Sequence, residues 1–544
     1  MMTPQERVRA AFAQLALSER PEAWITLRDL PSVLAEAVAL EARLAAGELL
    51  PLAGKLLAVK DNVDVAGLPT TAGCPTYAYH PEASAPAVQR LVDAGAIVLG
   101  KTNLDQFATG LVGTRSPYGA VRDVRDPSLV SGGSSSGSAV VVALGIADLA
   151  IGTDTAGSGR VPAAFQQIVG VKPTYGLVPT AGVVPACRSF DCVTIFARTL
   201  SEGRRAIRIM SDPVLPADAP LAAPPRPVVA VPATLTGLSD SYAEAFEQAV
   251  KSLEAAGVVV RAIRLEPFLA AAKLLYEGGF VAERYAAVGP FVDGGPDGID
   301  PTVGAIIRKA RDVPAHVLVS DSECLAELRR EAMAGWGDAD ALLLPTAPFQ
   351  PTIAAVTADP IGVNARLGTY TNFCNLFGLS AVAVPAPGIG VQVVARGFAD
   401  AVAADIAALI VGETPAPVSS GLPLLVVGAH LSGQPLNHQL TSAGARLRGA
   451  VRTAPEYRMY ALPSGKPGLV RVPSGGASIL GEVWELPPAT LGPFLAALPS
   501  PMALGKVRLD DGTSVTGFLC EQAGVDGAPD ITGHGGWLAY LESR

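Results

Sequence analysis

The chain has 544 residues, of which 49% are hydrophobic and 17% charged, with a formal net charge of −9 and an isoelectric point near 5.2. This length predicts more than one domain, and the apolar fraction predicts an extensive packed interior. No run of basic residues is present, which argues against nucleic acid as a partner. An acidic chain also repels anions, so a site for an anionic substrate would need local positive charge.

The N-terminus and the cysteines favour a cytoplasmic protein. A positively charged stretch followed by an apolar one is missing at the start, so we expect no signal peptide. The most apolar stretch, residues 139–151, contains Asp148 and is too short to cross a bilayer. The six cysteines form no CxxC pair, which is typical of reduced thiols without a metal site. They are Cys74, Cys187, Cys192, Cys324, Cys374 and Cys520.

Helical and strand patterns alternate along roughly the first 410 residues. Residues 3–6, Thr-Pro-Gln-Glu, form a capping box that predicts a helix to about residue 16. The alternation predicts a large mixed sheet flanked by helices, which is an α/β fold. The further expected elements are strands at 56–59, 96–99, 340–344 and 381–384 and from 258, and helices at 87–94, 242–257 and 399–411.

The composition changes near residue 413. Residues 413–423 are rich in proline, serine and glycine, which predicts a linker. Short strands and turns with little helix are expected after it. We therefore predict a catalytic domain over residues 1–412, the linker at 413–423, and a small, mostly β domain over residues 424–544. We find no internal repeat.

Lys60 is the first candidate for chemistry. It follows four apolar residues of a predicted buried strand and precedes Asp61-Asn62, a turn signal. A buried lysine loses its charge more readily than the reference pKa of about 10.4 implies, and the neutral amine is a general base. The structural alternative is a strand-end lysine that reaches out to water.

Two serines could use such a base. Ser134 follows Gly132-Gly133, which permits unusual backbone conformations, and precedes an apolar helix at 139–144. It could relay a proton between Lys60 and Ser158. Segment 132–138 is not a phosphate-binding loop, because no Gly-Lys-Ser/Thr follows it. A flexible linker is the alternative, but apolar segments flank it closely.

Ser158 lies in residues 152–160, Gly-Thr-Asp-Thr-Ala-Gly-Ser-Gly-Arg. Ala156 and Gly157 add almost no side-chain bulk, so their N–H groups could converge on a developing oxyanion. A helix expected to run from Ser158 through Phe165 would place its positive end at the same charge.

Histidine is the usual base for a serine nucleophile, but the five histidines are poorly placed. His430, His438 and His534 follow the predicted linker. His80 and His316 lie beside neither a small-residue turn nor an acidic motif. The sequence therefore favours lysine over a Ser-His-Asp triad.

Together, Lys60 in Val-Lys-Asp-Asn and segments 132–138, 152–160 and 170–176 resemble the amidase signature family, over about residues 25–410. The resemblance implies that Ser158 is the acylating nucleophile, that Ser134 is a bridging serine after a cis peptide bond, and that Lys60 is the general base. It implies an oxyanion hole at the N–H groups of Thr155, Ala156, Gly157 and Ser158, no cofactor, and a homodimer. Arg160 is expected to pair with an acid such as Asp191.

Two departures point to one branch of that family. The family usually has glycine at Ala156, and residues 189–197 lack its usual Gly-Pro. The second variant resembles the allophanate hydrolases. In that branch a tyrosine and an arginine hold the small anionic substrate, which implies that role for Tyr276 and Arg284. Eight residues apart, they would lie about 80° apart on one helix and could share its cleft-facing side. Taken alone, Arg284 would be interpreted as a surface arginine.

The tail resembles the γ-glutamyl cyclotransferase-like fold, through a glycine loop at 424–437 and a strand at 481–486. Allophanate hydrolases carry such a domain. In some of them it acts on the product of the amidase step, a dicarboxylated amine that loses carbon dioxide, although a role in assembly alone is equally open. His430 is a candidate acid or base there, or a loop histidine that bonds the backbone.

These observations predict an allophanate hydrolase that releases ammonia and carbon dioxide. Its substrate would come from a urea carboxylase or from a cyanurate pathway. The alternatives are an amidase for another small amide, an amidotransferase subunit that supplies ammonia to a partner, and a non-enzymatic scaffold.

Overall fold

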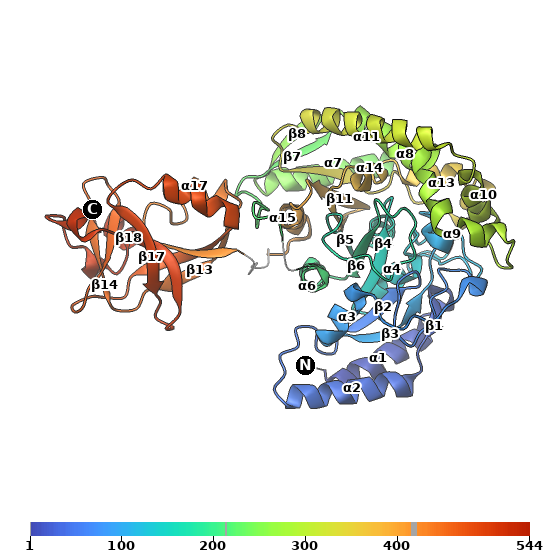
Figure 1. Ribbon diagram of the computed structural model, residues 1–544, viewed down its shortest axis with the longest axis horizontal. Coiled ribbons are helices and arrows are strands. Elements are labelled where there is room, and N and C mark those ends of the chain that lie inside the picture. Colours follow the sequence, from blue (N-terminus) through green and yellow to red (C-terminus); the bar gives the residue numbers. More distant parts are fainter. Residues whose placement is uncertain (1, 213–214, 415–420) are drawn as a thin grey trace. The chain divides into compact units, whose positions relative to one another are not determined.

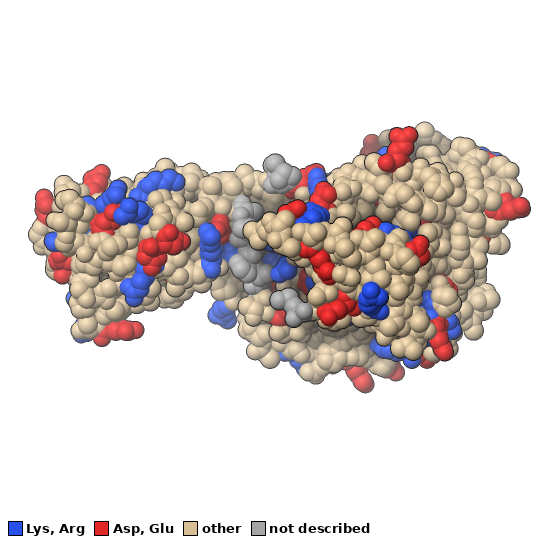
Figure 2. Space-filling model, turned by 90° about the horizontal axis from the view of Figure 1, so that it is seen from below, with Lys and Arg blue, Asp and Glu red and all other residues tan. Residues whose placement is uncertain are grey.

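The computed structural model describes residues 2–212, 215–414 and 421–544. Its contacts divide the chain into an N-terminal unit, Met1–Val214 and Arg226–Thr414, and a C-terminal unit, Leu215–Pro225 and Pro415–Arg544. No helix in these described ranges is both long enough and apolar enough to cross a membrane. On the face shown in Figure 2, acidic and basic side chains are interspersed, so this face carries no basic stripe of the kind that binds nucleic acid.

The N-terminal unit is built on one eleven-stranded sheet with the order β1-β3-β2-β4-β6-β5-β10-β11-β9-β7-β8. Pairs β2–β3, β2–β4, β7–β8 and β7–β9 are parallel and the others antiparallel, which confirms the predicted mixed sheet. The strands are β1 Trp24–Leu27, β2 Leu56–Lys60, β3 Ile97–Thr102, β4 Leu149–Asp154, β5 Val169–Lys172, β6 Cys192–Ala197, β7 Val228–Pro232, β8 Val259–Ile263, β9 Ala341–Pro345, β10 Ser380–Ala386 and β11 Ile389–Ala395.

Helices surround this sheet, with α1 and α2 at its β1 end and α11 beyond β7 and β8 (Figure 1). The predicted capping box is present, since Thr3 and Glu6 each accept the other's backbone N–H. The helices are α1 Pro4–Leu17, α2 Leu30–Ala45, α3 Pro86–Asp93, α4 Ser136–Ala143, α5 Val161–Gln166, α6 Leu200–Met210, α7 Asp240–Ala255, α8 Glu266–Glu277, α9 Ala282–Asp293, α10 Pro301–Ala310, α11 Ala315–Trp336, α12 Ile353–Ala358, α13 Gly362–Leu367, α14 Asn372–Leu376 and α15 Asp400–Val411.

Burial explains why the central strands have continuous apolar runs. Every residue of β2, β4 and β6 is buried, as expected for strands covered on both faces. Helix α4 is apolar nearly all round and lies in the core, as predicted for 139–144. Helix α5 begins only at Val161, so Ser158 lies before the helix and does not open it, contrary to the expectation.

The C-terminal unit is small and mostly β, as predicted. A five-stranded sheet has the order β13-β16-β12-β18-β17, and β14 and β15 form a separate pair. Its elements are β12 Leu422–Val426, α16 His438–Thr441, β13 Arg446–Arg452, β14 Tyr457–Ala461, β15 Pro467–Arg471, β16 Leu480–Leu486, α17 Leu491–Ala496, β17 Met502–Arg508, β18 Ser514–Cys520 and α18 Trp537–Glu542. Of the predicted linker 413–423, residues 415–420 lie outside the described residues, and its last two belong to β12.

An early segment packs into this late unit. Leu221 donates its N–H to the Gly444 carbonyl at 2.8 Å and accepts from Arg446 Nε at 2.7 Å. Ala489 N–H donates to the Ala217 carbonyl at 2.7 Å. The single division near residue 413 therefore does not describe residues 215–225, whose contacts are with strands that follow more than two hundred positions later.

Candidate active site

Lys60 ends β2 inside the sheet and is 0% exposed, which excludes the alternative of a lysine that reaches water. Its Nζ donates to Ser134 Oγ at 2.8 Å and to Thr153 Oγ1 at 2.7 Å. Burial lowers the pKa of Lys60 to about 7, against the opposing effect of nearby aspartates such as Asp105. Near neutral pH about half of this amine is therefore uncharged and able to accept a proton.

The loop before α4 fixes Ser134 against Lys60. The Gly133–Ser134 peptide bond is cis, the conformation that the resemblance implied. A side chain at Gly133 would overlap the carboxylate of Asp105. That carboxylate accepts the N–H groups of Gly113 and Arg115, each at 3.0 Å, and the Asp105 N–H donates to the Ser134 carbonyl at 3.1 Å. The glycine is thus required by the close approach of a buried acid.

Ser158 lies between β4 and α5 and is 3% exposed. Its Oγ faces the Gly110 carbonyl oxygen at 3.5 Å, and within the described residues it makes no hydrogen bond to Ser134 Oγ. The structure therefore joins Lys60 to Ser134 directly but leaves the second contact of the expected relay unmade. Catalytic hydrogen bonds are often long in the absence of substrate and shorten in the complex.

The loop before Ser158 is organised by Asp154, which the sequence analysis missed. Asp154 accepts the N–H of Gly157 at 2.8 Å and the N–H of Gly159 at 2.9 Å. Gly157 therefore drops out of the expected oxyanion donors, because Asp154 takes its hydrogen. The N–H groups of Thr155, Ala156 and Ser158 have no acceptor in the part of the chain that the structure describes.

Gly157 is required for a different reason. Its φ is +126°, which side-chain-bearing residues rarely adopt, and a Cβ there would overlap Thr371 Oγ1. Thr371 Oγ1 donates to the Ala156 carbonyl at 2.6 Å, which turns the Ala156–Gly157 peptide and holds it in place.

The expected partner of Arg160 is wrong. Arg160 pairs with Asp154 through Nε at 2.9 Å, and both side chains are fully buried. Burial alone would raise the pKa of Asp154, but Arg160 holds it below its usual value. Asp191 instead accepts Thr155 Oγ1 at 2.5 Å and the Ala186 N–H at 2.9 Å. The two acids brace opposite sides of the loop, because one ends β4 and the other precedes β6.

Tyr276 and Arg284 are brought together, but not on one helix. Helix α8 ends at Glu277 and α9 begins at Ala282, so the angular argument from a single helix is wrong. Arg284 Nη2 donates to Tyr276 Oη at 3.2 Å, and its guanidinium carbon lies 5.2 Å from the tyrosine ring centre. The break between the helices folds the two side chains onto each other.

Arg284 is buried, at 2% exposure, which excludes a surface arginine. Its Nη1 donates to Thr109 Oγ1 at 2.9 Å. No carboxylate oxygen lies within 4 Å of its nitrogen atoms anywhere in the described ranges. A buried guanidinium without a carboxylate partner is costly unless an anion compensates it. The charge of Arg284 also lowers the pKa of Lys60, which places the guanidinium within electrostatic reach of the base.

A cleft of about 970 Å³ opens beside these residues. Leu111 and Tyr276 both line it. Leu111 directly follows Gly110, whose carbonyl faces Ser158, and Tyr276 contacts Arg284. The cleft therefore leads to the serine–lysine site.

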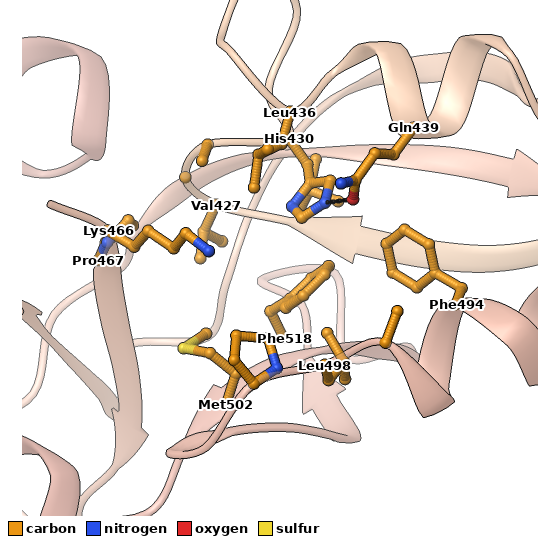
Figure 3. Close-up of a pocket in the computed structure, with 15 residues that line it drawn as sticks. Val427, His430, Leu436, Gln439, Lys466, Pro467, Phe494, Leu498, Met502 and Phe518 are labelled. Atoms are coloured by element: carbon orange, nitrogen blue, oxygen red, sulfur yellow. Dashed lines mark hydrogen bonds between the residues drawn. The ribbon is translucent and has the colours of Figure 1, made fainter. Parts of the chain in front are cut away.

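His430 lies in a second pocket of about 210 Å³, within the C-terminal unit (Figure 3). Its ring stacks on Phe518 with centroids 4.8 Å apart, and Nε2 lies 2.9 Å from Gln439 Oε1. The ring thus contacts side chains and not the backbone, contrary to the alternative of a loop histidine that bonds the backbone. Burial lowers the pKa of His430, so the neutral imidazole prevails near pH 7. His438 is exposed, and its Nδ1 lies 2.8 Å from the Pro435 carbonyl oxygen.

In the described residues, no group of three or more histidine, cysteine or acidic side chains could hold a metal ion. The chemistry available at the N-terminal site is nucleophilic: a base, two hydroxyls, free N–H donors and an anion-binding arginine.

Comparison with known proteins places both units. The sequence profile of the Amidase family matches residues 6–402, and that of the "Allophanate hydrolase C-terminal domain" matches residues 422–542. Urea amidolyase of Saccharomyces cerevisiae is 41% identical over 572 residues, covering 96% of this chain but 31% of the yeast protein. This chain therefore spans about a third of that relative's length.

Solved structures agree. The structure of Kluyveromyces lactis allophanate hydrolase has a TM-score of 0.90 and 38% identity, covering 100% of this chain and 97% of that one. Among sequence relatives that match the N-terminal unit alone, a glutamyl-tRNA(Gln) amidotransferase subunit of Thermus thermophilus is 33% identical over 433 residues, covering 71% of this chain and 90% of its own length.

Proposed function

Because this chain belongs to the amidase family and, along both of its units, to the allophanate hydrolases, we propose that it hydrolyses allophanate to ammonia and carbon dioxide. It is an amidohydrolase. The observation that carries the choice of substrate is Arg284, a buried guanidinium with no carboxylate partner in the described chain, beside a neutral lysine base.

Acylation begins with proton transfer. Uncharged Lys60 accepts the proton of Ser134 Oγ, which in turn accepts the proton of Ser158 Oγ. Ser158 Oγ then attacks the carbonyl carbon of the terminal amide. The carbonyl oxygen becomes an oxyanion and accepts hydrogen bonds from the N–H groups of Thr155, Ala156 and Ser158. One such donor contributes about 2.7–4 kcal/mol to transition-state stability.

The intermediate collapses when the proton on Lys60 returns through Ser134 to the leaving nitrogen. The C–N bond breaks, ammonia departs, and an acyl group remains on Ser158. Water then attacks that acyl group through the same relay. Arg284 and Tyr276 hold the substrate carboxylate, which suits the planar fork of arginine. The product is a dicarboxylated amine, which yields carbon dioxide when its C–N bonds break.

We propose that the C-terminal unit promotes this loss of carbon dioxide. Support comes from the resemblance to allophanate hydrolases whose tail acts on that product, and from a neutral, enclosed His430 beside Lys466 in one pocket. Figure 3 shows both side chains lining the cavity, the imidazole from above Phe518 and the lysine from beside it. The catalytic part of the chain, over residues 1–412, and the tail, over 424–544, would then act in sequence on one substrate.

We further propose a cytoplasmic homodimer whose allophanate comes from a urea carboxylase or a cyanurate-degrading enzyme. The longer relatives are named urea amidolyases, which supports the first source. A second candidate function is hydrolysis of a larger, neutral amide, because the cleft of about 970 Å³ exceeds what allophanate fills.

The test compares allophanate, malonamide and an aryl amide as substrates of the purified chain, with ammonia and carbon dioxide measured. We expect allophanate to have the highest kcat/KM and Ser158→Ala to be inactive on all three. Faster turnover of malonamide or the aryl amide would favour the second candidate. Ammonia release only in the presence of a partner protein would favour the amidotransferase alternative.

A further inference from the structure

The cleft beside the active site is walled by three helices. Helices α8 and α10 form two of its walls and α13 contributes a third. Figure 1 shows the three helices gathered on one side of the N-terminal unit. Because the cleft reaches Tyr276 and Leu111, a molecule bound for Ser158 passes between these helices. The side chains on its walls are therefore the first that a substrate meets.

Those walls differ in charge from the rest of the protein. Four cationic side chains line the cleft, and Glu277 is the single carboxylate among its described lining residues. The cations are Arg115, Lys273, Lys309 and Arg366. The whole chain has a formal net charge of −9, so this concentration of positive charge is local.

The two arginines are already engaged. Arg115 is buried, and its guanidinium donates to the carbonyl oxygens of Thr109 and Pro360. Arg366 lies 3.8 Å from an Asp359 carboxylate oxygen. Both therefore have structural partners that would compete with a substrate.

The two lysines are not engaged in this way. Lys273 on α8 and Lys309 on α10 are exposed and line the same cleft from different helices. Neither has a carboxylate oxygen within 4 Å among residues 2–212, 215–414 and 421–544. An ammonium on a flexible four-carbon stem can follow an anion over several ångströms. A wall of unpaired charge in a low-dielectric cleft also focuses the field toward its interior.

We propose that Lys273 and Lys309 form an anion-capture pair, which draws the substrate carboxylate into the cleft and passes it to Arg284 and Tyr276. The proposal rests on the proposed function, since it takes the substrate to be an anionic amide. The pair overcomes the repulsion that a chain of net charge −9 exerts on such a substrate. It discriminates anionic from neutral amides before any chemistry occurs.

The test replaces both lysines, as Lys273→Gln/Lys309→Gln. The matched control is Lys251→Gln/Lys506→Gln, which removes the same charge from exposed lysines outside the cleft. We expect the cleft variant to lose about 3- to 10-fold in kcat/KM for allophanate at low salt, with kcat unchanged. Wild-type kcat/KM should fall with added salt and meet that of the variant near about 0.5 M. The control should follow the wild type.

Paired probes separate this proposal from the proposed function. Malonamate carries the same carboxylate as allophanate with a methylene in place of a nitrogen, and malonamide is its neutral counterpart. Only malonamate should be affected by the cleft substitutions, even if allophanate is not the substrate. Labelling of Ser158 by a carboxylate-bearing and an uncharged fluorophosphonate gives the same comparison without turnover. Equal effects on anionic and neutral compounds, or no effect at low salt, would overturn the capture pair.

Discussion

Replacement of Lys60 tests the base most directly. Burial lowers the pKa of Lys60 from 10.5 to about 7, a shift worth about 5 kcal/mol. At pH 7 the neutral fraction is then about one half, compared with about 1 in 3,000 for an unperturbed lysine. Burial therefore raises the concentration of active base by roughly a thousandfold. Methionine is close to lysine in size and cannot accept a proton, so Lys60→Met isolates this contribution.

The assay is ammonia release as a function of pH, since kcat/KM reports the pKa values of the free enzyme. We expect the wild-type kcat/KM to rise tenfold per pH unit below pH 7, with a midpoint at about 7, and to level off above it. Lys60→Met should lose on the order of 10³-fold in kcat and lose this rise. His80→Ala and His316→Ala are the controls, because histidine titrates in the same range.

Stability gives an independent measurement with a defined sign. Burial favours the neutral amine, so between pH 7 and 10.5 the unfolded chain keeps a proton that the folded protein has released. The free energy of unfolding of the wild type should thus rise, relative to that of Lys60→Met, by about 1.4 kcal/mol per pH unit in this window. Below pH 7 the difference should be constant. Urea titrations of both proteins from pH 6 to 9 would show it.

Two results would refute this reasoning. One is a rise near pH 7 that persists in Lys60→Met, or that either histidine substitution removes. The other is a midpoint near that of an ordinary lysine, because the amine would then be charged at neutral pH and a different group would have to activate Ser158.

Three further substitutions test the remaining parts. Arg284→Ala should lower kcat/KM for allophanate about 10²-fold while turnover of malonamide changes little, and it should move the pH midpoint upward because the charge of Arg284 lowers the pKa of Lys60; equal losses on both substrates would contradict the carboxylate clamp. Gly157→Ala should lower kcat about 10²-fold with little change in KM, since the new Cβ overlaps Thr371 and displaces the oxyanion donors; a fully active variant would show that the loop tolerates another geometry. His430→Ala should leave ammonia release from the amidase step intact and slow release of carbon dioxide about tenfold, whereas His438→Ala should affect neither; unchanged release of carbon dioxide would assign the C-terminal unit to assembly.

Local signals in the sequence were sufficient for the elements and for the main site residues. The capping box at Thr3 and the apolar run that ends at Lys60 depend on neighbours within a few positions, and both are present as predicted. The mixed sheet followed from the alternation of helix and strand patterns. Ser134 was recognisable because its glycines permit the tight loop that precedes α4.

Contacts between distant segments could not be predicted in this way. Asp154 and Asp191 were equally plausible partners for Arg160, and only the folded sheet shows that Asp154 reaches it. Arg284 meets Thr109, which lies far away in sequence, and meets its nearer neighbour Tyr276 only because a helix breaks between them. The commitment of the Gly157 N–H to Asp154 likewise depends on a turn whose geometry no residue pattern specified.

The passage of the chain between its two units has a practical consequence. Because residues 215–225 belong to the C-terminal unit, the polypeptide crosses from one unit to the other three times. A gene cut near codon 412 would leave buried Leu221 without its cover, and a fragment starting at residue 421 would lack the hydrogen bonds that Leu221 makes to Gly444 and Arg446. Evolution or an engineer could separate two such activities into independent proteins only by rebuilding this early segment, so the two halves are inherited and degraded as a pair.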